Sequence, residues 1–179
     1  MNQIKIAQAP LYTSPNPMTF ICSKKANGKT NMATLSFWTY ASTNPGKVVF
    51  SLNKGAYTLE LLAKNNEVII AVPGAELAGA LIACGTSSGR DTDKVEKFNI
   101  AMQKLDGTEI CVPELTRLAI VAKVNSTVDA DDHILHICDV TTVTYFYGQF
   151  FYIAIMQKYL AFRIEAESCF FPPFYLNKR

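Results

Sequence analysis

The sequence predicts a mainly β protein, an antiparallel β-barrel with a few short helices that cover it. Segments rich in β-branched and aromatic residues recur along the chain, separated by turn signals such as Asn27-Gly28 and Pro45-Gly46. Short helical segments fall between them without the regular alternation that parallel βαβ winding requires. A chain of 179 residues fits one domain, so we expect residues 1–179 to fold as a single unit.

The first elements are expected to be strands. Met18–Ser23 is a short apolar run, and the turn Ala26–Lys29 that follows contains the Asn-Gly pair typical of β-hairpins. Two further strands are predicted at Ala33–Tyr40 and Lys47–Leu52, with the loop Thr43–Gly46 between them.

Short helices come next and strands return at the end. The expected elements are a helix at Tyr57–Asn65, a strand at Glu67–Val72, helices at Glu76–Cys84 and Asp93–Gln103, and strands at Leu118–Val128 and His133–Tyr145. Gly85 can end the second helix, and Asp91 or Thr92 can cap the third. An acidic turn, residues 129–132, joins the last two strands.

Composition narrows the class of protein. The formal net charge is +2 and no dense run of Lys or Arg occurs, which argues against electrostatic binding to nucleic acid or to an anionic membrane. Five cysteines are widely spaced without a CxxC pair, a pattern that fits reduced core thiols better than disulfides or a zinc site. With no apolar signal-peptide region at the N-terminus, we expect a cytoplasmic protein.

The uncharged stretch Val140–Gln157 has nearly the length of a membrane-spanning helix. Its threonines, its glycine and its four aromatic residues between Tyr145 and Phe150 give it the character of a strand. We therefore predict a buried strand followed by an interface segment, and no membrane partner.

Several common sites are missing from the sequence. There is no G-x-G-x-x-G after the first strand, no G-x-x-x-x-G-K-[ST] and no H-E-x-x-H. His133 and His136 lie three residues apart in a predicted strand, so their side chains should face opposite ways and form no metal pair. No metal site is predicted, and a structural role is the alternative for both histidines.

A phosphate-binding segment is the strongest chemical signal. Ser87, Ser88 and Gly89 offer hydroxyl and backbone donors, and Arg90 and Lys94 add positive charge beside a predicted helix start. Such a segment, taken alone, fits an anion site and an ordinary solvated turn equally well.

Two other segments could complete a ligand site. Ser51, Leu52 and Lys54 leave a strand, and Thr58 stands at a helix start, where it can also act as a simple N-cap. The segment 31–38 is polar at its beginning and aromatic at its end. Together the three segments suit a flat heteroaromatic ring that carries a phosphate.

The order of these segments resembles the flavin-reductase-like family of FMN-binding split barrels, and its flavoredoxin branch in particular. The resemblance covers roughly residues 10–140 and rests on their joint spacing. The matching stretches are Pro17-Met18, Gly28 to Ser36, Val49 to Lys54, Tyr57-Thr58, Gly85 to Lys94 and Asp132-His133.

The resemblance implies a Greek-key antiparallel split barrel that binds FMN in a groove at a homodimer interface. Residues implied to line the flavin ring are Asn31, Ala33, Thr34, Leu35, Ser36 and Phe37. The residues implied to surround the ribityl phosphate, or to lie on the strand beside it, are Ser51, Leu52, Lys54, Thr58, Ser87, Ser88, Gly89, Arg90 and Lys94. His133 would approach the flavin from the last strand, as a weak catalytic candidate.

The sequence departs from the family in three places. Phe37 stands where the family usually has Trp, so the aromatic wall is either shifted or shared with Trp38. Val95 replaces a usual Phe. Residues 141–179 differ from the usual family ending and are interpreted either as an arm that packs on a partner subunit or as an altered terminus that weakens flavin closure.

Three functions follow as hypotheses. The first is a flavin reductase-like oxidoreductase that moves electrons from NADH or NADPH through FMN to free flavin, an acceptor protein or oxygen. The second is a flavoredoxin-type electron carrier without nicotinamide turnover. The third is a cofactor-free dimeric binding domain, favoured by the altered C-terminal segment.

Overall fold

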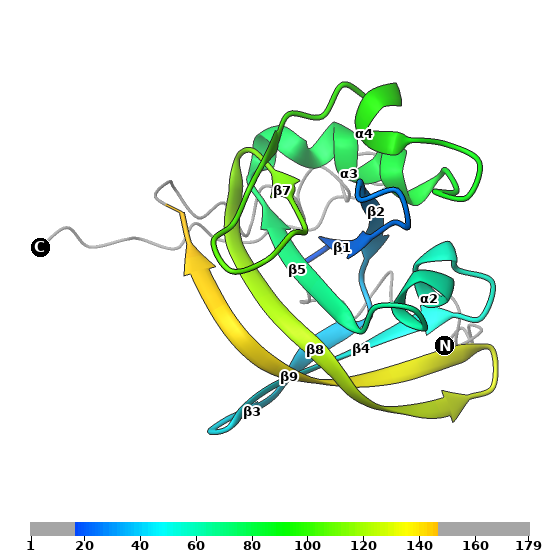
Figure 1. The fold of residues 1–179 in the computed structure, drawn as a ribbon, viewed down its shortest axis with the longest axis vertical. Helices are drawn as coiled ribbons and strands as arrows, with labels where there is room; N and C mark the ends of the chain where they lie inside the picture. Colours follow the sequence, from blue (N-terminus) through cyan, green and yellow to red (C-terminus); the bar gives the residue numbers. More distant parts are fainter. Residues whose placement is uncertain (1–16, 147–179) are drawn as a thin grey trace, which may run out of the picture.

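A computed structural model describes residues 17–146 of the chain (Figure 1). The helical elements are α2 (Tyr57–Leu62), the 3-10 turn η2 (Ala75–Leu77), α3 (Ala78–Gly85) and α4 (Lys94–Lys97). The strands are β1 (Thr19–Lys24), β2 (Thr30–Leu35), β3 (Trp38–Thr43), β4 (Gly46–Asn53), β5 (Glu67–Pro73), β6 (Met102–Gln103), β7 (Val112–Pro113), β8 (Thr116–Ala130) and β9 (His133–Tyr145).

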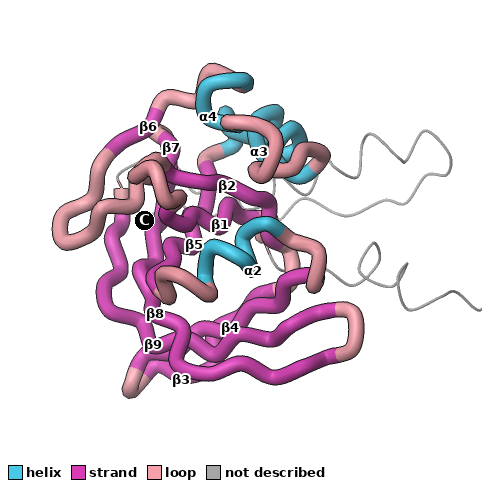
Figure 2. Tube along the Cα trace, turned by 45° about the vertical axis from the view of Figure 1, so that its right-hand side comes forward, coloured by secondary structure: helices cyan, strands magenta, loops and turns pink. Residues whose placement is uncertain are grey.

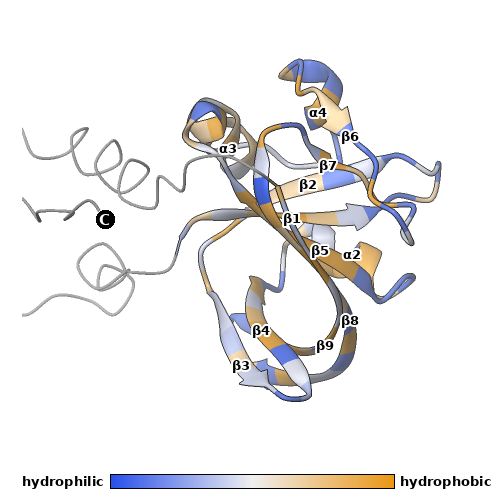
Figure 3. Cartoon of the chain, turned by 90° about the vertical axis from the view of Figure 1, so that its left-hand side faces the viewer, coloured by the Kyte–Doolittle hydropathy of each residue, from blue (hydrophilic) through white to orange (hydrophobic). Residues whose placement is uncertain are grey.

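Seven strands form one antiparallel sheet in the order β2-β1-β5-β8-β9-β4-β3. The long strands β8 and β9 curve, and they carry β4 and β3 around to lie below β1 and β2 (Figure 1 and Figure 3). Helices α3 and α4 contact β2, whereas α2 contacts β1, β2 and β4 (Figure 2). The predicted mainly β split barrel with short helices is confirmed.

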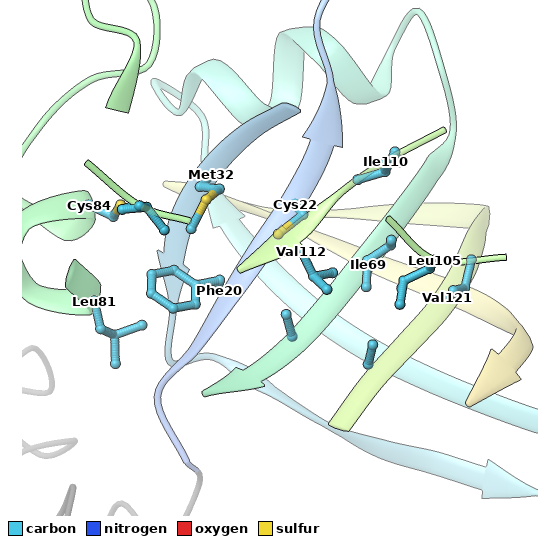
Figure 4. Packing of buried hydrophobic residues seen from close by; sticks show 13 residues of the cluster. Phe20, Cys22, Met32, Ile69, Leu81, Cys84, Leu105, Ile110, Val112 and Val121 are labelled. Atoms are coloured by element: carbon cyan, nitrogen blue, oxygen red, sulfur yellow. The ribbon is translucent and has the colours of Figure 1, made fainter. Parts of the chain in front are cut away.

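The strands β1 and β5 and the first half of β8, as far as Ala122, bury side chains on both faces. Successive side chains of a strand point to opposite faces, and here Phe20 and Ile69 join one apolar cluster while Ile21 and Ile70 join the other. The first cluster lies under α3 and the β6–β7 segment (Figure 4). The second fills the curl of the sheet and includes Trp38, Val48, Phe50, Leu62 and Cys138.

Most of the predicted strands are confirmed. The hairpin at Asn27-Gly28 joins β1 to β2, and Gly28 adopts the positive φ of 81° that such a turn requires. The predicted strand Ala33–Tyr40 is wrong as a single element, because it divides into β2 and β3. Leu35 and Trp38 both point into the cluster inside the curl, and the chain turns a corner between them.

The helix predicted at Asp93–Gln103 is much shorter than expected. It covers only Lys94–Lys97, and Asn99 follows with a φ of 48°, a left-handed conformation that does not continue a helix. The N-cap is Asp93, whose carboxylate accepts a bond from the backbone N–H of Glu96, and not Asp91 or Thr92. In the preceding helical region, η2 and α3 replace the single helix expected at Glu76–Cys84.

The stretch Val140–Gln157 is described only as far as residue 146. Its first part completes β9, so the predicted strand is confirmed there, but Thr141, Thr142 and Val143 are exposed and the expectation of burial is wrong. The divergent segment 141–179, interpreted as an arm or an altered terminus, is described only as far as residue 146, and its remainder lies outside the described residues. None of the helices within residues 17–146 is both long and apolar enough to cross a membrane.

Three of the cysteines are buried core thiols, as predicted. Cys22, Cys84 and Cys138 are buried and free, while Cys111 is partly exposed. Burial raises the pKa of Cys22 and of Cys84, and raises that of Cys138 to about 12. These thiols are therefore protonated near neutral pH and behave as small apolar residues.

His136 belongs to the core and should make stability depend on pH. Its ring stacks on Phe50 with centroids 4.7 Å apart, and burial lowers its pKa below the ordinary 6.5. The unfolded chain thus takes up a proton at higher pH than the native one. The free energy of unfolding should keep its full value above about pH 6.5 and fall as the pH decreases below it.

The substitution His136→Phe should remove this part of the pH dependence, because phenylalanine cannot take up a proton. Urea unfolding of both proteins at a series of pH values between about 7.5 and 5 measures the difference. Carboxylates contribute equally to both curves. An identical decline in the two proteins would contradict the prediction.

Candidate functional site

Asn31 is the centre of a polar cluster at the edge of the sheet. It lies on the edge strand β2, and its side chain is buried. Its amide Nδ2 lies 3.3 Å from the hydroxyl of Ser23 on β1 and 3.1 Å from that of Thr58 on α2. A buried amide must find such partners, so Asn31 fixes α2 against the hairpin β1–β2.

Thr58 does not cap α2, which corrects the simpler reading of this residue. Ala56 occupies the N-cap position and makes no side-chain capping bond, whereas Thr58 is 1% exposed and accepts the bond from Asn31. Burial of this hydroxyl follows from the packing of α2 against β1 and β2.

The backbone of Gly89 lies directly against Asn31. A Cβ atom added at Gly89 would lie 2.0 Å from Oδ1 of Asn31 and 3.1 Å from Cδ1 of Tyr57. Only glycine allows so close an approach. The structure thus brings together residues from all three segments that the sequence singled out: Asn31, Thr58 and Gly89.

Arg90 connects this loop to α2. Its guanidinium pairs with the carboxylate of Glu60 and lies 5.6 Å from the ring centroid of Tyr57. The hydroxyl of Ser88 accepts a 3.2 Å bond from the backbone N–H of Arg90. Ser87 is partly buried beside it. The loop is thereby held over the first turn of α2.

Lys94 is a buried cation next to the same loop. It is 4% exposed, and its Nζ donates a 2.6 Å hydrogen bond to the carbonyl of Cys84 at the end of α3. Burial lowers its pKa, since the charged form loses hydration. Within residues 17–146 this ammonium has no carboxylate partner, and it retains donors for an anion.

The remaining β2 residues have separate roles. Leu35 is buried in the cluster inside the curl, and Ala33 packs against it. The hydroxyl of Thr34 bonds the carbonyl of Leu81 on α3. Because β2 is the last strand of the seven-stranded sheet, the backbone groups on its outer side make no ladder bonds within the described chain. Ser36, partly buried, lies between β2 and β3.

A second group of predicted site residues gathers at the end of β4. The backbone N–H of Ser51 donates a 2.8 Å bond to the carbonyl of Phe37, whose ring lies 5.6 Å from that of His133. Leu52, the neighbour of Ser51, is buried in the core. Lys54 Nζ lies 2.9 Å from each carboxylate oxygen of Asp129.

The two aromatic residues after β2 behave differently. Phe37 is 45% exposed, whereas Trp38 is 5% exposed and donates a 2.9 Å bond to the carbonyl of Pro17. Trp38 therefore belongs to the core, and only Phe37 can offer an accessible ring. Val95, the other departure from the family pattern, packs against the cluster under α3.

A cavity of about 430 Å³ lies apart from both groups. It is lined by the end of β1, the segment before β5 and the loop 107–109, and it contains none of the predicted site residues. Its polar side chains bond one another: Lys24 pairs with Glu109, and Thr108 donates to Glu67.

Sequence reasoning missed several residues of these groups. Ser23 faces Asn31 across the hairpin, a register that the Asn-Gly turn could have indicated. Glu60 and Asp129, the partners of Arg90 and Lys54, were not singled out, since nothing local to either residue identifies its distant partner.

The fold is that of the flavin-reductase-like split barrels. Residues 11–153 match the family described as "Flavin reductase like domain". Because the match spans most of the chain, the protein belongs to this family.

Solved structures share the fold at low sequence identity. The flavoredoxin of Desulfovibrio vulgaris (Miyazaki F) has a TM-score of 0.70 and 16% identity, covering 81% of this chain and 76% of its own. An FMN-binding protein from Thermus thermophilus with bound 1-cyclohex-2-enone has a TM-score of 0.70 and 18% identity, covering 81% and 78%. The styrene monooxygenase flavin reductase of Pseudomonas putida S12 has a TM-score of 0.68 and 20% identity, covering 79% and 86%.

A sequence relative is an uncharacterized protein of Archaeoglobus fulgidus. It is 25% identical over 119 residues, which are 65% of this chain and 66% of that protein. The matched part of this chain thus spans slightly less than two thirds of its relative.

Gly89→Ala should destabilise the protein by about 1–3 kcal/mol, because the new methyl group must push the loop away from Asn31. Gly79→Ala is the matched control. It lies in α3, where an added Cβ would meet no described atom within 4 Å apart from its chain neighbours and the backbone of its own helix, so it should stabilise by roughly 0.5–1 kcal/mol. Urea unfolding measures both changes. Equal stabilities of the two variants would contradict the close approach at Gly89.

Proposed function

We propose that this protein binds FMN along the outer edge of β2 and acts as a flavin reductase-like oxidoreductase. The main support is that Asn31, Thr58 and Gly89 lie together, while the buried ammonium of Lys94 bonds the end of α3, from which the loop of Gly89 follows. Family membership supports a flavin as the ligand. The names of two similar structures, an FMN-binding protein and a flavin reductase, point to the same cofactor and reaction class.

The donor set suits a phosphate. Ser87, Ser88 and Arg90 offer hydroxyl, backbone and guanidinium donors in one loop. Lys94 adds a desolvated positive charge, which binds an anion more strongly than a hydrated one does. In this proposal the loop and Lys94 hold the phosphate, and Thr58 keeps α2 in place beside it.

The edge of β2 suits the ring of the cofactor. Free backbone groups from Asn31 to Ser36 can pair with the polar atoms of an isoalloxazine, and the exposed ring of Phe37 can lie against it. His133 packs beside Phe37 and so comes within the same surface.

FMN, when bound, would supply the redox chemistry, with NADH or NADPH as the proposed electron donor. The residues of this chain bind and orient the ring and the phosphate. No general acid or base is required for hydride transfer, in keeping with the absence of a catalytic carboxylate pair from the described groups.

We also propose that the protein is a homodimer and that it is cytoplasmic. We infer a homodimer, because Phe37 and Tyr40 expose aromatic surface at the edge strand β3, which a second subunit can cover. Cys22, Cys84 and Cys138 remain free thiols, which supports a cytoplasmic protein. The acceptor would be free flavin, oxygen or an electron-acceptor protein.

A second candidate is an electron carrier without nicotinamide turnover. The structural similarity to a flavoredoxin favours it. Both candidates use the same cofactor site and differ only in the source of electrons.

The purified protein should take up FMN and show flavin absorbance. Anaerobic mixing with NADH or NADPH should then bleach this absorbance at about 1 s⁻¹ or faster. Bleaching by a chemical reductant alone would support the electron carrier instead. A colourless protein that takes up no FMN would overturn both candidates and leave the cofactor-free binding domain.

Lys94→Ala should weaken FMN binding by roughly 1.5–3 kcal/mol, because a charged hydrogen bond to the phosphate is lost. Riboflavin lacks the phosphate, so its affinity should change little, and this comparison separates a lost contact from a damaged fold. Lys97→Ala, an exposed cation on the same helix, is the control. Equal losses for FMN and riboflavin would count against the phosphate contact.

A further inference from the structure

We infer that Lys54 is a positioning residue for His133 and does not contact the phosphate of the cofactor. Its predicted effect on the rate of flavin reduction rests on the proposed function. The inference departs from the sequence expectation, which grouped Lys54 with the phosphate ligands. The inference is drawn from the contacts of Lys54 with the acidic turn, residues 129–132.

Lys54 holds the acidic turn with both its side chain and its backbone. Its ammonium lies 2.9 Å from each oxygen of Asp129, and its backbone N–H donates a 3.0 Å bond to the carbonyl of Asp132. The ammonium holds the pKa of the Asp129 carboxyl below its usual value. Both side chains are largely exposed, so the pair contributes little to stability. The effect of the Lys54–Asp129 pair is therefore to hold the turn in its conformation.

The turn passes this constraint to His133. The backbone N–H of Asp131 donates a 3.0 Å bond to Asp129, and Asp131 adopts a φ of 56°. His133 begins β9 directly after the turn, opposite Asn53 of β4. Its Nδ1 lies 2.8 Å from Oδ1 of Asp132. Lys54, Asp129, Asp132 and His133 thus form one continuous set of contacts.

The ring of His133 also lies beside that of Phe37. The two rings lie 5.6 Å apart at 39°, and the carbonyl of Phe37 is bonded to Ser51 on β4. The two rings therefore lie together beside the end of β4, and Lys54 directly follows that strand.

The side chain of Lys54 also forms its bonds away from the residues proposed to bind the phosphate. Its side-chain hydrogen bonds and ion pair in the described chain go to Asp129 and not to Asn31, Thr58 or the loop 86–90. Arg90 and Lys94 supply the charge there, as described above.

Three variants and a control test the inference. Lys54→Met and Asp129→Asn each break the ion pair, and Lys54→Arg preserves it. Lys47→Met is the matched control, since it removes the same charge from β4, the strand that Lys54 directly follows, and breaks a pair with Asp139 on β9. The chain has two histidines, so the ring signals of His136 in the core serve as an internal reference in NMR spectra.

In the flavin-free protein, Lys54→Met and Asp129→Asn should both shift the ring signals of His133 and leave those of His136 unchanged. Lys54→Arg should restore the parent spectrum, and Lys47→Met should retain it. Unchanged His133 signals in both disruptive variants would overturn the inference. This readout needs no cofactor, so it remains decisive even where the proposed flavin function fails.

In the flavin-loaded protein, both disruptive variants should slow reduction by NADH or NADPH about three- to tenfold, since His133 is misplaced. The ratio of FMN to riboflavin affinity should stay within about twofold of the parent, because no phosphate contact is lost. A tenfold loss of FMN affinity in Lys54→Met, with riboflavin binding and Asp129→Asn unaffected, would assign Lys54 to the phosphate and overturn the inference.

Discussion

The buried amide of Asn31 is the interaction on which the site depends. A polar group removed from water must find partners, and Asn31 finds them on β1 and on α2. Its oxygen faces Gly89, which lacks the side chain that would exclude it. A residue on one edge strand thereby sets the positions of a helix and of a loop that follow it much later in the chain.

The barrel supplies the rigid frame for this amide. The strands β1, β5 and β8 bury apolar side chains on both faces, so the edge strand β2 is anchored to a sheet that cannot shift its register without exposing a core cluster. Within the described chain no strand pairs with the outer side of β2, and Phe37, which follows β2, lies beside His133 of β9.

The cations around the site differ in their electrostatic state. Arg90 and Lys54 are each matched by a carboxylate at the surface, where hydration and salt reduce the effect of the pair. Lys94 is buried, and its hydrogen bond goes to a carbonyl. Because this buried ammonium has no carboxylate partner within the described chain, it would gain more than the other two cations from binding an anion. For this reason we propose that Lys94 and the adjacent loop hold the phosphate.

The sequence by itself determined the local features: the Asn-Gly hairpin, the long strands around the acidic turn, the cysteines of the core and the three polar segments. These follow from turn chemistry and from side-chain periodicity, which act over a few residues. Only the tertiary structure decided that Ala33–Tyr40 divides at a corner, that the helix after Asp93 stops at Lys97, and that Lys54 pairs with Asp129 while Lys94 is buried. The ion pair of Lys54 and the burial of Lys94 depend on contacts with residues distant in the sequence, which no local preference of the sequence reveals.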